Sequence, residues 1–227
     1  MSDSSAIDIS LFSLRVSASV ITRALAVLDD AERATAAERD GDARRRYVVA
    51  HAAARVVLGE RLGVDAERVV ITSEPAGRPL VDGLSFSLSH SGDRAAVALA
   101  AAGVSVGVDL ERVRSRPHLD RLAERVFAPD DYARWCTLAP RDRPRSLAQR
   151  WTEVEAVLKA RGLGIARSGT AGGLAAAGDP GPGWSRVAID AGSGFVGAVA
   201  ADRSPITVTT HAFRLGDALT RRGGTAH

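Results

Sequence analysis

The chain has 227 residues, of which 45% are hydrophobic and 25% charged, and its 30 basic residues nearly balance 27 acidic ones. This length and composition are typical of a globular protein with one large domain or two small ones. The single cysteine, Cys136, excludes an intrachain disulfide, and the first residues lack the basic start and apolar run of a secretory signal. We therefore expect a cytoplasmic protein.

The sequence disfavours membrane and nucleic-acid functions. Arg, Asp or Gly interrupts each apolar stretch before it reaches the roughly eighteen residues that cross a bilayer. Aromatic residues are only 4% of the chain and are not interleaved with basic ones, as they are in proteins that stack single-stranded bases. Lys159 is the single lysine, and arginine favours bidentate contacts with phosphate and carboxylate groups, although a GC-rich genome also enriches arginine. We expect no membrane and no nucleic-acid partner.

Hydrophobic periodicity in the first half of the chain predicts helices followed by a hairpin. The alternating stretch at 7–16 is typical of an edge strand. The Ser-Gly-Asp sequence before residue 94 is hairpin chemistry. The elements expected after the edge strand are, in order, a helix at 17–38, a helix at 43–62 capped by Asp42 and ended by Gly63, and strands at 69–72, 84–89 and 95–101.

The second half repeats the order of helices and strands about once. We therefore expect an α/β (α+β) fold of two similar halves, residues 1–103 and 104–215, with a flexible tail at 216–227. The elements expected here are a strand at 104–111, a helix at 118–126, a helix starting at Pro129, a long helix at 145–162 closed by Gly162 and Gly164, a flexible loop at 166–183, and strands at 184–189, 194–201 and 206–213.

Two separate acidic clusters indicate a split cation site. Asp109 and Glu111 are two residues apart on a predicted strand, so both carboxylates leave the same face. Glu155 and Lys159 are four apart in the long helix, which places them on neighbouring turns of one face. Three oxygen donors without nearby Cys or His favour magnesium or manganese, which bind phosphate esters. Each cluster alone also fits an exposed strand end or a surface ion pair.

A serine-rich strand end provides a candidate anion pocket. Phe86 and Leu88 alternate with serines, and the strand runs into a turn that carries Ser89 and His90. These side chains can donate hydrogen bonds to an anion, and Arg78 adds a planar donor. The alternative is a turn whose serines satisfy only their own backbone.

The order of these segments resembles a known family. Gly-Arg-Pro at 77–79, a Phe-x-x-Ser-His-Ser strand end, Gly-Val-Asp-x-Glu, and Trp-Thr-x-x-Glu-Ala-x-x-Lys-Ala-x-Gly-x-Gly at 151–164 have the order and approximate spacing of the 4'-phosphopantetheinyl transferases, specifically the monomeric Sfp-like class. The resemblance covers roughly residues 40–200. It implies a pseudo-twofold fold in which coenzyme A lies across the cleft between the halves.

The resemblance implies transfer of the 4'-phosphopantetheine arm of coenzyme A to a serine of an acyl or peptidyl carrier protein, with release of 3',5'-ADP. Asp109, Glu111 and Glu155 would bind Mg²⁺, with Mn²⁺ as an alternative, together with the pyrophosphate of coenzyme A. Glu155 is also the candidate base, and Lys159 would stabilise the transferring or departing phosphate. A coenzyme A-binding protein without transfer activity and a magnesium-dependent phosphohydrolase are the alternatives.

The remaining coenzyme A contacts are also implied by the resemblance. Arg78 with Pro79 is expected on the adenine side of coenzyme A. His90 is expected to contact the 3'-phosphate or ribose, and the alternative is that it stabilises its turn by a hydrogen bond. Tyr47 and His51, one helical turn apart, are expected to pack within the helix or to make a polar contact, and not to be ligands. The candidates for the 3'-phosphate and ribose are Arg45, Arg46, Ser89 and His90.

One position departs from the family pattern. Members commonly have Lys immediately before the metal-binding Glu, where this chain has Val154, so we expect a missing positive charge near the pyrophosphate and an altered rate or substrate preference. Two similar halves in one chain favour a monomer. A basic segment after the acidic strand is the candidate docking surface for an acidic carrier protein, or else a solvated face: Arg112, Arg114, Arg116, Arg121 and Arg125.

Overall fold

The computed structural model describes residues 5–74, 78–115, 117–163 and 173–223. In the first half of the chain, the hairpin predicted at 84–101 is confirmed, and the strand predicted at 69–72 is found at Thr72–Ser73. The elements are β1 (Ala6–Ser13), α1 (Ala18–Val27), α2 (Asp30–Ala37), α3 (Gly41–Leu62), a 3₁₀ turn (Ala66–Arg68), β2 (Thr72–Ser73), β3 (Pro79–Leu80), β4 (Leu84–Ser91) and β5 (Arg94–Ala101).

The second half contains the predicted strands and the long helix, with boundaries shifted by one or two residues. The mixed α/β class predicted from the sequence is therefore confirmed. The elements are β6 (Val106–Arg112), α4 (Leu119–Val126), α5 (Pro129–Cys136), α6 (Arg143–Ala160), α7 (Gly173–Ala177), β7 (Ser185–Ile189), β8 (Phe195–Ala201), β9 (Thr207–Ala212) and α8 (Leu215–Gly223).

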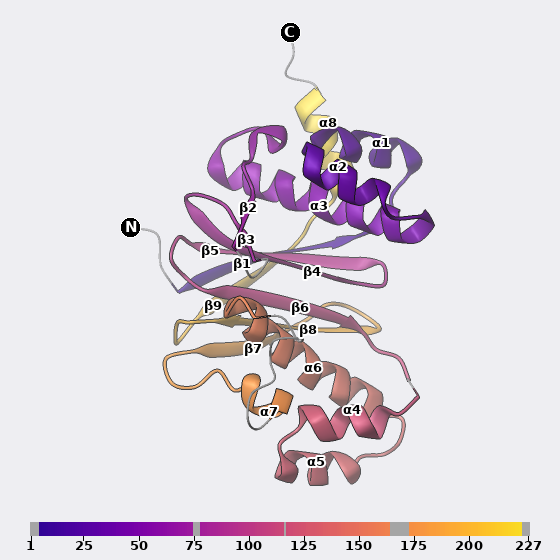
Figure 1. The fold of residues 1–227 in the computed structure, drawn as a ribbon, viewed down its shortest axis with the longest axis vertical. Helices are drawn as coiled ribbons and strands as arrows, with labels where there is room; N and C mark the ends of the chain where they lie inside the picture. Colours follow the sequence, from indigo (N-terminus) through magenta and orange to yellow (C-terminus); the bar gives the residue numbers. More distant parts are fainter. Residues whose placement is uncertain (1–4, 75–77, 116, 164–172, 224–227) are drawn as a thin grey trace.

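Two sheets stack between two layers of helices (Figure 1). The first of these sheets has the order β4-β5-β1-β9 and the second β6-β8-β7, and β2 and β3 form a separate two-stranded sheet. Buried aliphatic side chains, including Ile7 and Ile9 of β1 and Val108 and Leu110 of β6, form the core between the sheets. The helices α1, α2, α3 and α8 cover the outer face of the first sheet, and α6 packs on the second (Figure 1).

The prediction that the first strand lies at an edge is wrong. β1 pairs antiparallel with β5 and parallel with β9, so it lies inside its sheet. The neighbour on its second side comes from the other end of the chain. Local periodicity cannot reveal such a partner, because the alternating pattern of a strand does not depend on which strand pairs with it.

The residues predicted to form one helix over 17–38 form two helices, because a capping box starts a second helix after Leu28. Leu28 is extended, and the Asp29 carboxylate accepts a hydrogen bond from the Glu32 N–H while the Glu32 carboxylate accepts one from the Asp29 N–H. The next helix starts at Gly41 with Asp40, not Asp42, at its N-cap. It ends at Gly63, in the left-handed conformation, as predicted.

The tail predicted to be flexible from residue 216 is helical up to Gly223, so that prediction is wrong for 216–223; residues 224–227 lie outside the described residues. Leu215, Ala218 and Leu219 are buried against the core that α1 and α3 share. The spacing of Leu215, Ala218 and Leu219 places these apolar residues on one face of a helix, which is the pattern that indicates α8 in the sequence. The division into halves at residue 103 and their pseudo-twofold relation stay predictions, and both β9 and α8 pack on elements of the first half.

A glycine allows α6 to lie directly on β6. Gly107, Asp109 and Glu111 share the face of β6 opposite to the buried Val108 and Leu110. A Cβ atom at Gly107 would overlap the Ala156 carbonyl oxygen and come within 2.5 Å of the Ala160 nitrogen. The absence of a side chain here therefore sets the distance between the helix and the acidic strand.

Gly107→Ala should lower the free energy of unfolding by about 2 to 3 kcal/mol, because both sides of the clash are backbone that must separate. The control is Gly216→Ala in α8, where the added Cβ meets only the Val20 side chain at 3.3 Å. Urea denaturation of both variants measures the difference. Equal stabilities would show that the contact between α6 and β6 is looser than described.

Candidate functional site

The carboxylates predicted to share a site face one cavity of about 390 Å³. β6 supplies Asp109 and Glu111, and α6 supplies Glu155 and Lys159 from the turns that follow one another along the same helix face. The other residues that line this cavity are His51, Leu88, Ser89, His90, Leu110 and Trp151. Residues from both sheets and from two helices therefore meet at one place.

Lys159 is the cation that compensates Asp109. Its Nζ lies 2.7 Å from Asp109 Oδ1 and also donates a hydrogen bond to the Val108 carbonyl oxygen at 3.1 Å. The Ser89 hydroxyl donates to the same carboxylate oxygen at 2.8 Å. Burial raises the pKa of Asp109, while the Lys159 ammonium and the Ser89 hydroxyl oppose that rise.

The surroundings of Glu155 disfavour its ionised form. Its Oε1 is buried and makes no hydrogen bond in the described structure. Burial raises the pKa of Glu155 to about 7, and the negative charges of Asp109 and Glu111 add to the rise while Lys159 opposes it. A buried polar atom without a partner is rare in native proteins and often marks a place where an ion or ligand binds.

The donor set fits a magnesium ion in its chemistry, but the carboxylates do not close around one. Among the described residues, His, Cys, Asp and Glu form no group of three arranged to hold a metal. Asp109 Oδ1 is instead held by Lys159 and Ser89. Three hard oxygen donors, one of them with an orphaned oxygen, are nevertheless the type of ligand that Mg²⁺ or Mn²⁺ takes.

The serines of β4 point to β6 rather than to their own turn. The hydroxyls of Ser87, Ser89 and Ser91 accept hydrogen bonds from the N–H groups of the next strand, at 3.1, 3.2 and 3.1 Å. The backbone groups that they bind are those of Val108, Leu110 and Arg112. The expected contact of Ser89 with coenzyme A stays a prediction, and its hydroxyl already holds Leu110 and Asp109 together.

Cationic groups surround His90. Burial lowers the pKa of His90, and the nearby positive charges of His51, Lys159 and Arg46 lower it further. Arg46 lies 3.9 Å from Asp42. Arg45 is held by the Leu14 carbonyl oxygen at 2.6 Å and by Asp42, and it lines neither of the cavities at the site.

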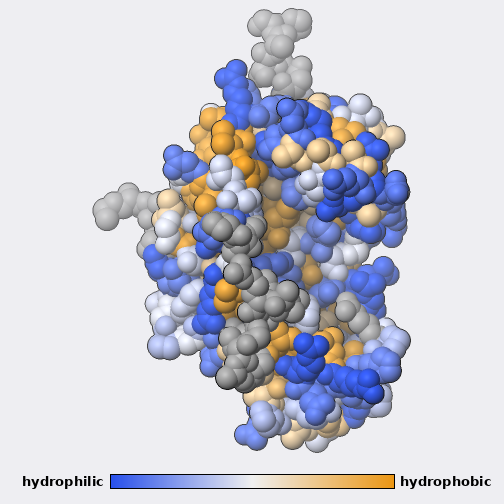
Figure 2. All heavy atoms as spheres, in the orientation of Figure 1, coloured by the Kyte–Doolittle hydropathy of each residue, from blue (hydrophilic) through white to orange (hydrophobic). Residues whose placement is uncertain are grey.

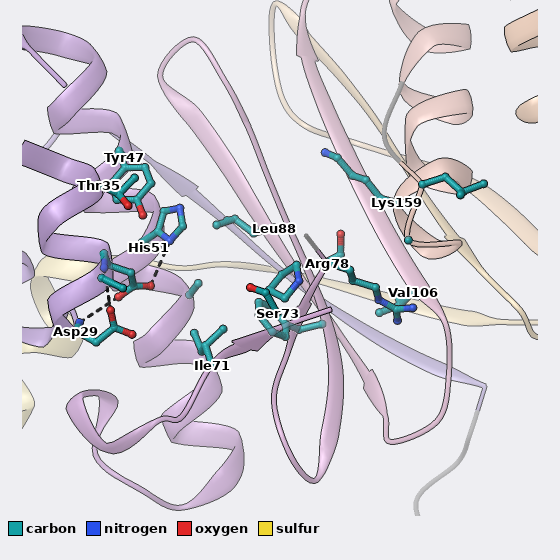
Figure 3. Close-up of a pocket in the computed structure, with 18 residues that line it drawn as sticks. Asp29, Thr35, Tyr47, His51, Ile71, Ser73, Arg78, Leu88, Val106 and Lys159 are labelled. Atoms are coloured by element: carbon teal, nitrogen blue, oxygen red, sulfur yellow. Dashed lines mark hydrogen bonds and ion pairs between the residues drawn. The ribbon is translucent and has the colours of Figure 1, made fainter. Parts of the chain in front are cut away.

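A larger cavity of about 550 Å³ adjoins the acidic one (Figure 3). Arg78 and Pro79 line it, as does Lys159, so it meets the smaller cavity at α6. Figure 3 shows Asp29, Thr35, Tyr47 and His51 on the helical side and Arg78, Val106 and Lys159 on the other. Arg78 also donates to the Ala160 carbonyl oxygen at 3.4 Å. Gly77 and Gly164, which belong to the sequence motifs, lie outside the described residues.

Sequence reasoning missed the helical wall of this cavity. The Tyr47 and His51 rings stack at 4.0 Å, and His51 Nδ1 lies 3.3 Å from Glu32 Oε1. Glu32 and Asp29 both pair with the buried Arg55, whose guanidinium also donates to the Val69 carbonyl oxygen at 2.9 Å. The capping box at 29–32 and an arginine inside an apolar helix were the available signals.

The expectation that Val154 leaves the pyrophosphate short of a charge is wrong. Val154 is 1% exposed and packs in the core between α4, α5 and α6, against Leu158 and Leu174. Its methyl lies 2.5 Å from the position that a Cβ of Gly178 would occupy. One residue along a helix turns the side chain by about 100°, so the neighbour of Glu155 faces away from the cavity.

The predicted docking segment lies beside the acidic cavity. Arg112 and Arg114 line a small apolar hollow together with Glu111, Leu119 and Trp151. Arg121 and Arg125 are exposed on α4, and Arg116 lies outside the described residues. Figure 2 shows hydrophilic residues next to hydrophobic ones at the α4 and α5 end of the molecule. The structure thus places basic and apolar surface together near Glu111.

Part of the chain matches a family model and several known proteins. Residues 105–177 match the family model described as the 4'-phosphopantetheinyl transferase superfamily. The 4'-phosphopantetheinyl transferase HetI of Nostoc sp. is 36% identical over 132 residues, which are 55% of this chain and 54% of that protein. A putative 4'-phosphopantetheinyl transferase of Synechocystis sp. is 34% identical over 127 residues, 54% of this chain and 51% of that protein.

A third similar protein, matched over a shorter segment, is also named as a 4'-phosphopantetheinyl transferase. The 4'-phosphopantetheinyl transferase AcpT of Salmonella typhimurium is 38% identical over 87 residues, 38% of this chain and 43% of that protein. The chain spans about half the length of the curated relatives that it matches. These matches confirm the resemblance to the 4'-phosphopantetheinyl transferases that the motifs predicted. Among the described residues, none of the helices combines the length and the apolar character needed to cross a bilayer.

Val154→Lys should destabilise the fold by about 3 kcal/mol or more, because it buries an ammonium in an apolar core. The same change at Val70, which is 73% exposed, should alter stability by less than about 0.5 kcal/mol. Urea denaturation measures both. If the Val154→Lys protein were stable and only its reaction rate changed, residue 154 would lie at the cavity and not in the core.

The stability of the metal-free protein should fall as the pH rises through the pKa of Glu155. The folded pKa of about 7 is above the ordinary value of 4.5, so the contribution of the protonated carboxyl is complete below the ordinary value and is lost through pH 7. Glu155→Gln should keep that contribution. Unfolding curves between about pH 5 and pH 8 in a chelator measure the difference. Parallel profiles for the two proteins would contradict the raised pKa.

Proposed function

We propose that the protein is a 4'-phosphopantetheinyl transferase of the Sfp-like class. It transfers the 4'-phosphopantetheine arm of coenzyme A to a serine of an acyl or peptidyl carrier protein and releases 3',5'-ADP. The observation that carries the proposal is the unpartnered, buried oxygen of Glu155 in a cavity that also receives Asp109, Glu111 and Lys159. These four residues fall within the segment that matches the superfamily model.

The three carboxylates are proposed to hold Mg²⁺, with Mn²⁺ as a substitute. When bound, the ion neutralises charge on the pyrophosphate of coenzyme A and so makes 3',5'-ADP a better leaving group. Asp109, Glu111 and Glu155 are the ligands in this proposal. Lys159 already pairs with Asp109 Oδ1, so a cation held by Asp109 would share this carboxylate with Lys159.

Glu155 and Lys159 are the proposed catalytic residues. The serine hydroxyl of the carrier protein loses its proton to Glu155, directly or through a water, as its oxygen bonds to the phosphorus next to the pantetheine arm. A cation held by the three carboxylates would lower the pKa of Glu155 from its metal-free value of about 7, so that Glu155 would be ionised and able to accept a proton near neutral pH. The bond from that phosphorus to 3',5'-ADP breaks, and the Lys159 ammonium stabilises the negative charge that the phosphates carry.

Coenzyme A is proposed to extend from the larger cavity into the acidic one. Both cavities are lined by His51, Leu88 and Lys159, so a ligand that occupies both passes these residues. Arg78 and Pro79 are proposed on the adenine side. The 3'-phosphate is assigned to His90 and to Arg46, a positive charge near His90, although Arg46 lines neither cavity. Arg45 and Ser89 are assigned as less direct contributors, because Arg45 is held by the Leu14 carbonyl oxygen and Ser89 by Asp109.

The carrier protein is proposed to dock on the basic segment beside Glu111. Acidic helices next to the modified serine would complement Arg112, Arg114, Arg121 and Arg125, and the shallow apolar surface lined by Leu119 and Trp151 would add a hydrophobic contact. We also propose that the protein acts as a monomer in the cytoplasm.

The proposal is tested by incubating the protein with coenzyme A, Mg²⁺ and an apo carrier protein and measuring the mass of the carrier. The expected result is a phosphopantetheine adduct. Binding of coenzyme A without an adduct would support a binding protein instead. Breakdown of coenzyme A without a carrier would support a phosphohydrolase.

Glu155→Gln should reduce the transfer rate by about a thousandfold or more, because it removes both a metal ligand and the base, while the fold is retained. The control is Glu153→Gln on the same helix, since the Glu153 carboxylate pairs with Arg150 and Arg186 instead of facing the cavity. The mass assay gives the rates, and circular dichroism checks folding. Equal rates for the two variants would remove Glu155 from the mechanism.

A further inference from the structure

Serine side chains, not backbone ladders, join the two sheets at the site. β4 and β6 lie at the ends of different sheets, and they pack side by side in the described structure. In the antiparallel pairing of β6 with β8, alternate N–H groups of β6 point away from β8. Those of Val108, Leu110 and Arg112 are satisfied by serine hydroxyls of β4. We call these serines, Ser87, Ser89 and Ser91, the seam serines.

Two of the seam serines have a second bond that the third lacks. A serine hydroxyl has one proton and can accept at its oxygen at the same time. Ser89 accepts from Leu110 and donates to Asp109 Oδ1 at 2.8 Å. Ser91 accepts from Arg112 and donates to Glu111 Oε2 at 2.7 Å. The structure gives Ser87 a bond to β6 backbone alone.

These bonds restrain the two carboxylates of β6. Ser89 and Ser91 are 5% and 8% exposed, so water has little access to replace a lost hydroxyl. Glu111 has three rotatable side-chain bonds, and a hydrogen bond from an oxygen that is itself fixed by the Arg112 N–H removes much of that freedom. Ligand carboxylates in metal sites are commonly held in this way by a neighbouring donor.

We infer that Ser91 is a positioning residue that sets the Glu111 carboxylate for the divalent cation, as Ser89 does for Asp109, whereas the Ser87 hydroxyl binds no carboxylate among the described residues and contacts β6 through its backbone. The inference rests on the proposed function, since it concerns the proposed metal ligands. It gives the serines of the strand end a role in preparing the cation site. Ser91 acts through Glu111 and touches neither the ion nor the substrate.

The test compares Ser91→Ala, Ser91→Thr and Ser87→Ala. Mn²⁺ is titrated into each protein saturated with coenzyme A, without a carrier protein, and electron paramagnetic resonance measures the free ion. Ser91→Ala should bind Mn²⁺ about ten to a hundred times more weakly. Ser91→Thr, which keeps the hydroxyl, should restore the affinity. Ser87→Ala should bind Mn²⁺ like the wild type, although it also loses a bond between the strands.

A kinetic readout separates positioning from general damage to the fold. In the mass assay, Ser91→Ala should need a higher Mg²⁺ concentration for half-maximal rate, with kcat approached again at saturating Mg²⁺. Unfolding curves should show a loss of stability for both variants, and a larger one for Ser91→Ala, because Ser91 bonds to the Arg112 N–H and to Glu111 whereas Ser87 bonds to the Val108 N–H.

The outcomes distinguish this inference from the proposed function. Unchanged Mn²⁺ affinity in Ser91→Ala, or an equal loss in Ser87→Ala, overturns the positioning role even if the wild type forms the carrier adduct. A wild type that binds no Mn²⁺ also overturns it, and the adduct assay then decides the proposed function separately. Failure of Ser91→Thr to restore affinity would show that the Ser91 hydroxyl is not the group that matters.

Discussion

The site depends on how the outer edge of β6 is satisfied. A strand at the end of a sheet presents N–H and C=O groups that need partners when they are buried. Here the partners are side chains: seam serines bind the amides, and Lys159 binds the Val108 carbonyl oxygen. Ser89 and Lys159 also bind Asp109, and Ser91 also binds Glu111. The side chains that satisfy the backbone edge therefore also hold the carboxylates in place.

The close contact of α6 with β6 gives this arrangement its electrostatic character. Because Gly107 has no side chain, the helix backbone lies against the strand and brings Glu155 near Asp109 and Glu111, with Lys159 as the compensating cation. Burial raises the pKa of Glu155 to about 7, and the negative charges of Asp109 and Glu111 add to the rise. One oxygen of Glu155 is buried and has no hydrogen-bond partner in the described structure. Such a cluster costs stability in the absence of a cation, as is common where a fold prepares a binding site.

The end of the chain packs against elements from its beginning. β9 leaves the second half to pair with β1, and α8 then packs on α3 among the helices of the first half (Figure 1). The cavities lie on the seam between the sheets, where residues of α3, β4, β6 and α6 meet. A ligand in them therefore contacts segments that are far apart in the sequence.

The sequence by itself determined the two strands and the long helix that carry the site, and the chemical types of its residues. The period of two in β6 placed Asp109 and Glu111 on one face, and the spacing of four in α6 placed Glu155 above Lys159, because both relations depend only on local backbone geometry. The motif order gave the family resemblance. Only the tertiary structure decided that β1 lies inside its sheet, that Val154 is in the core, and that the serines of β4 bind β6, because these facts depend on which distant segment packs against each residue.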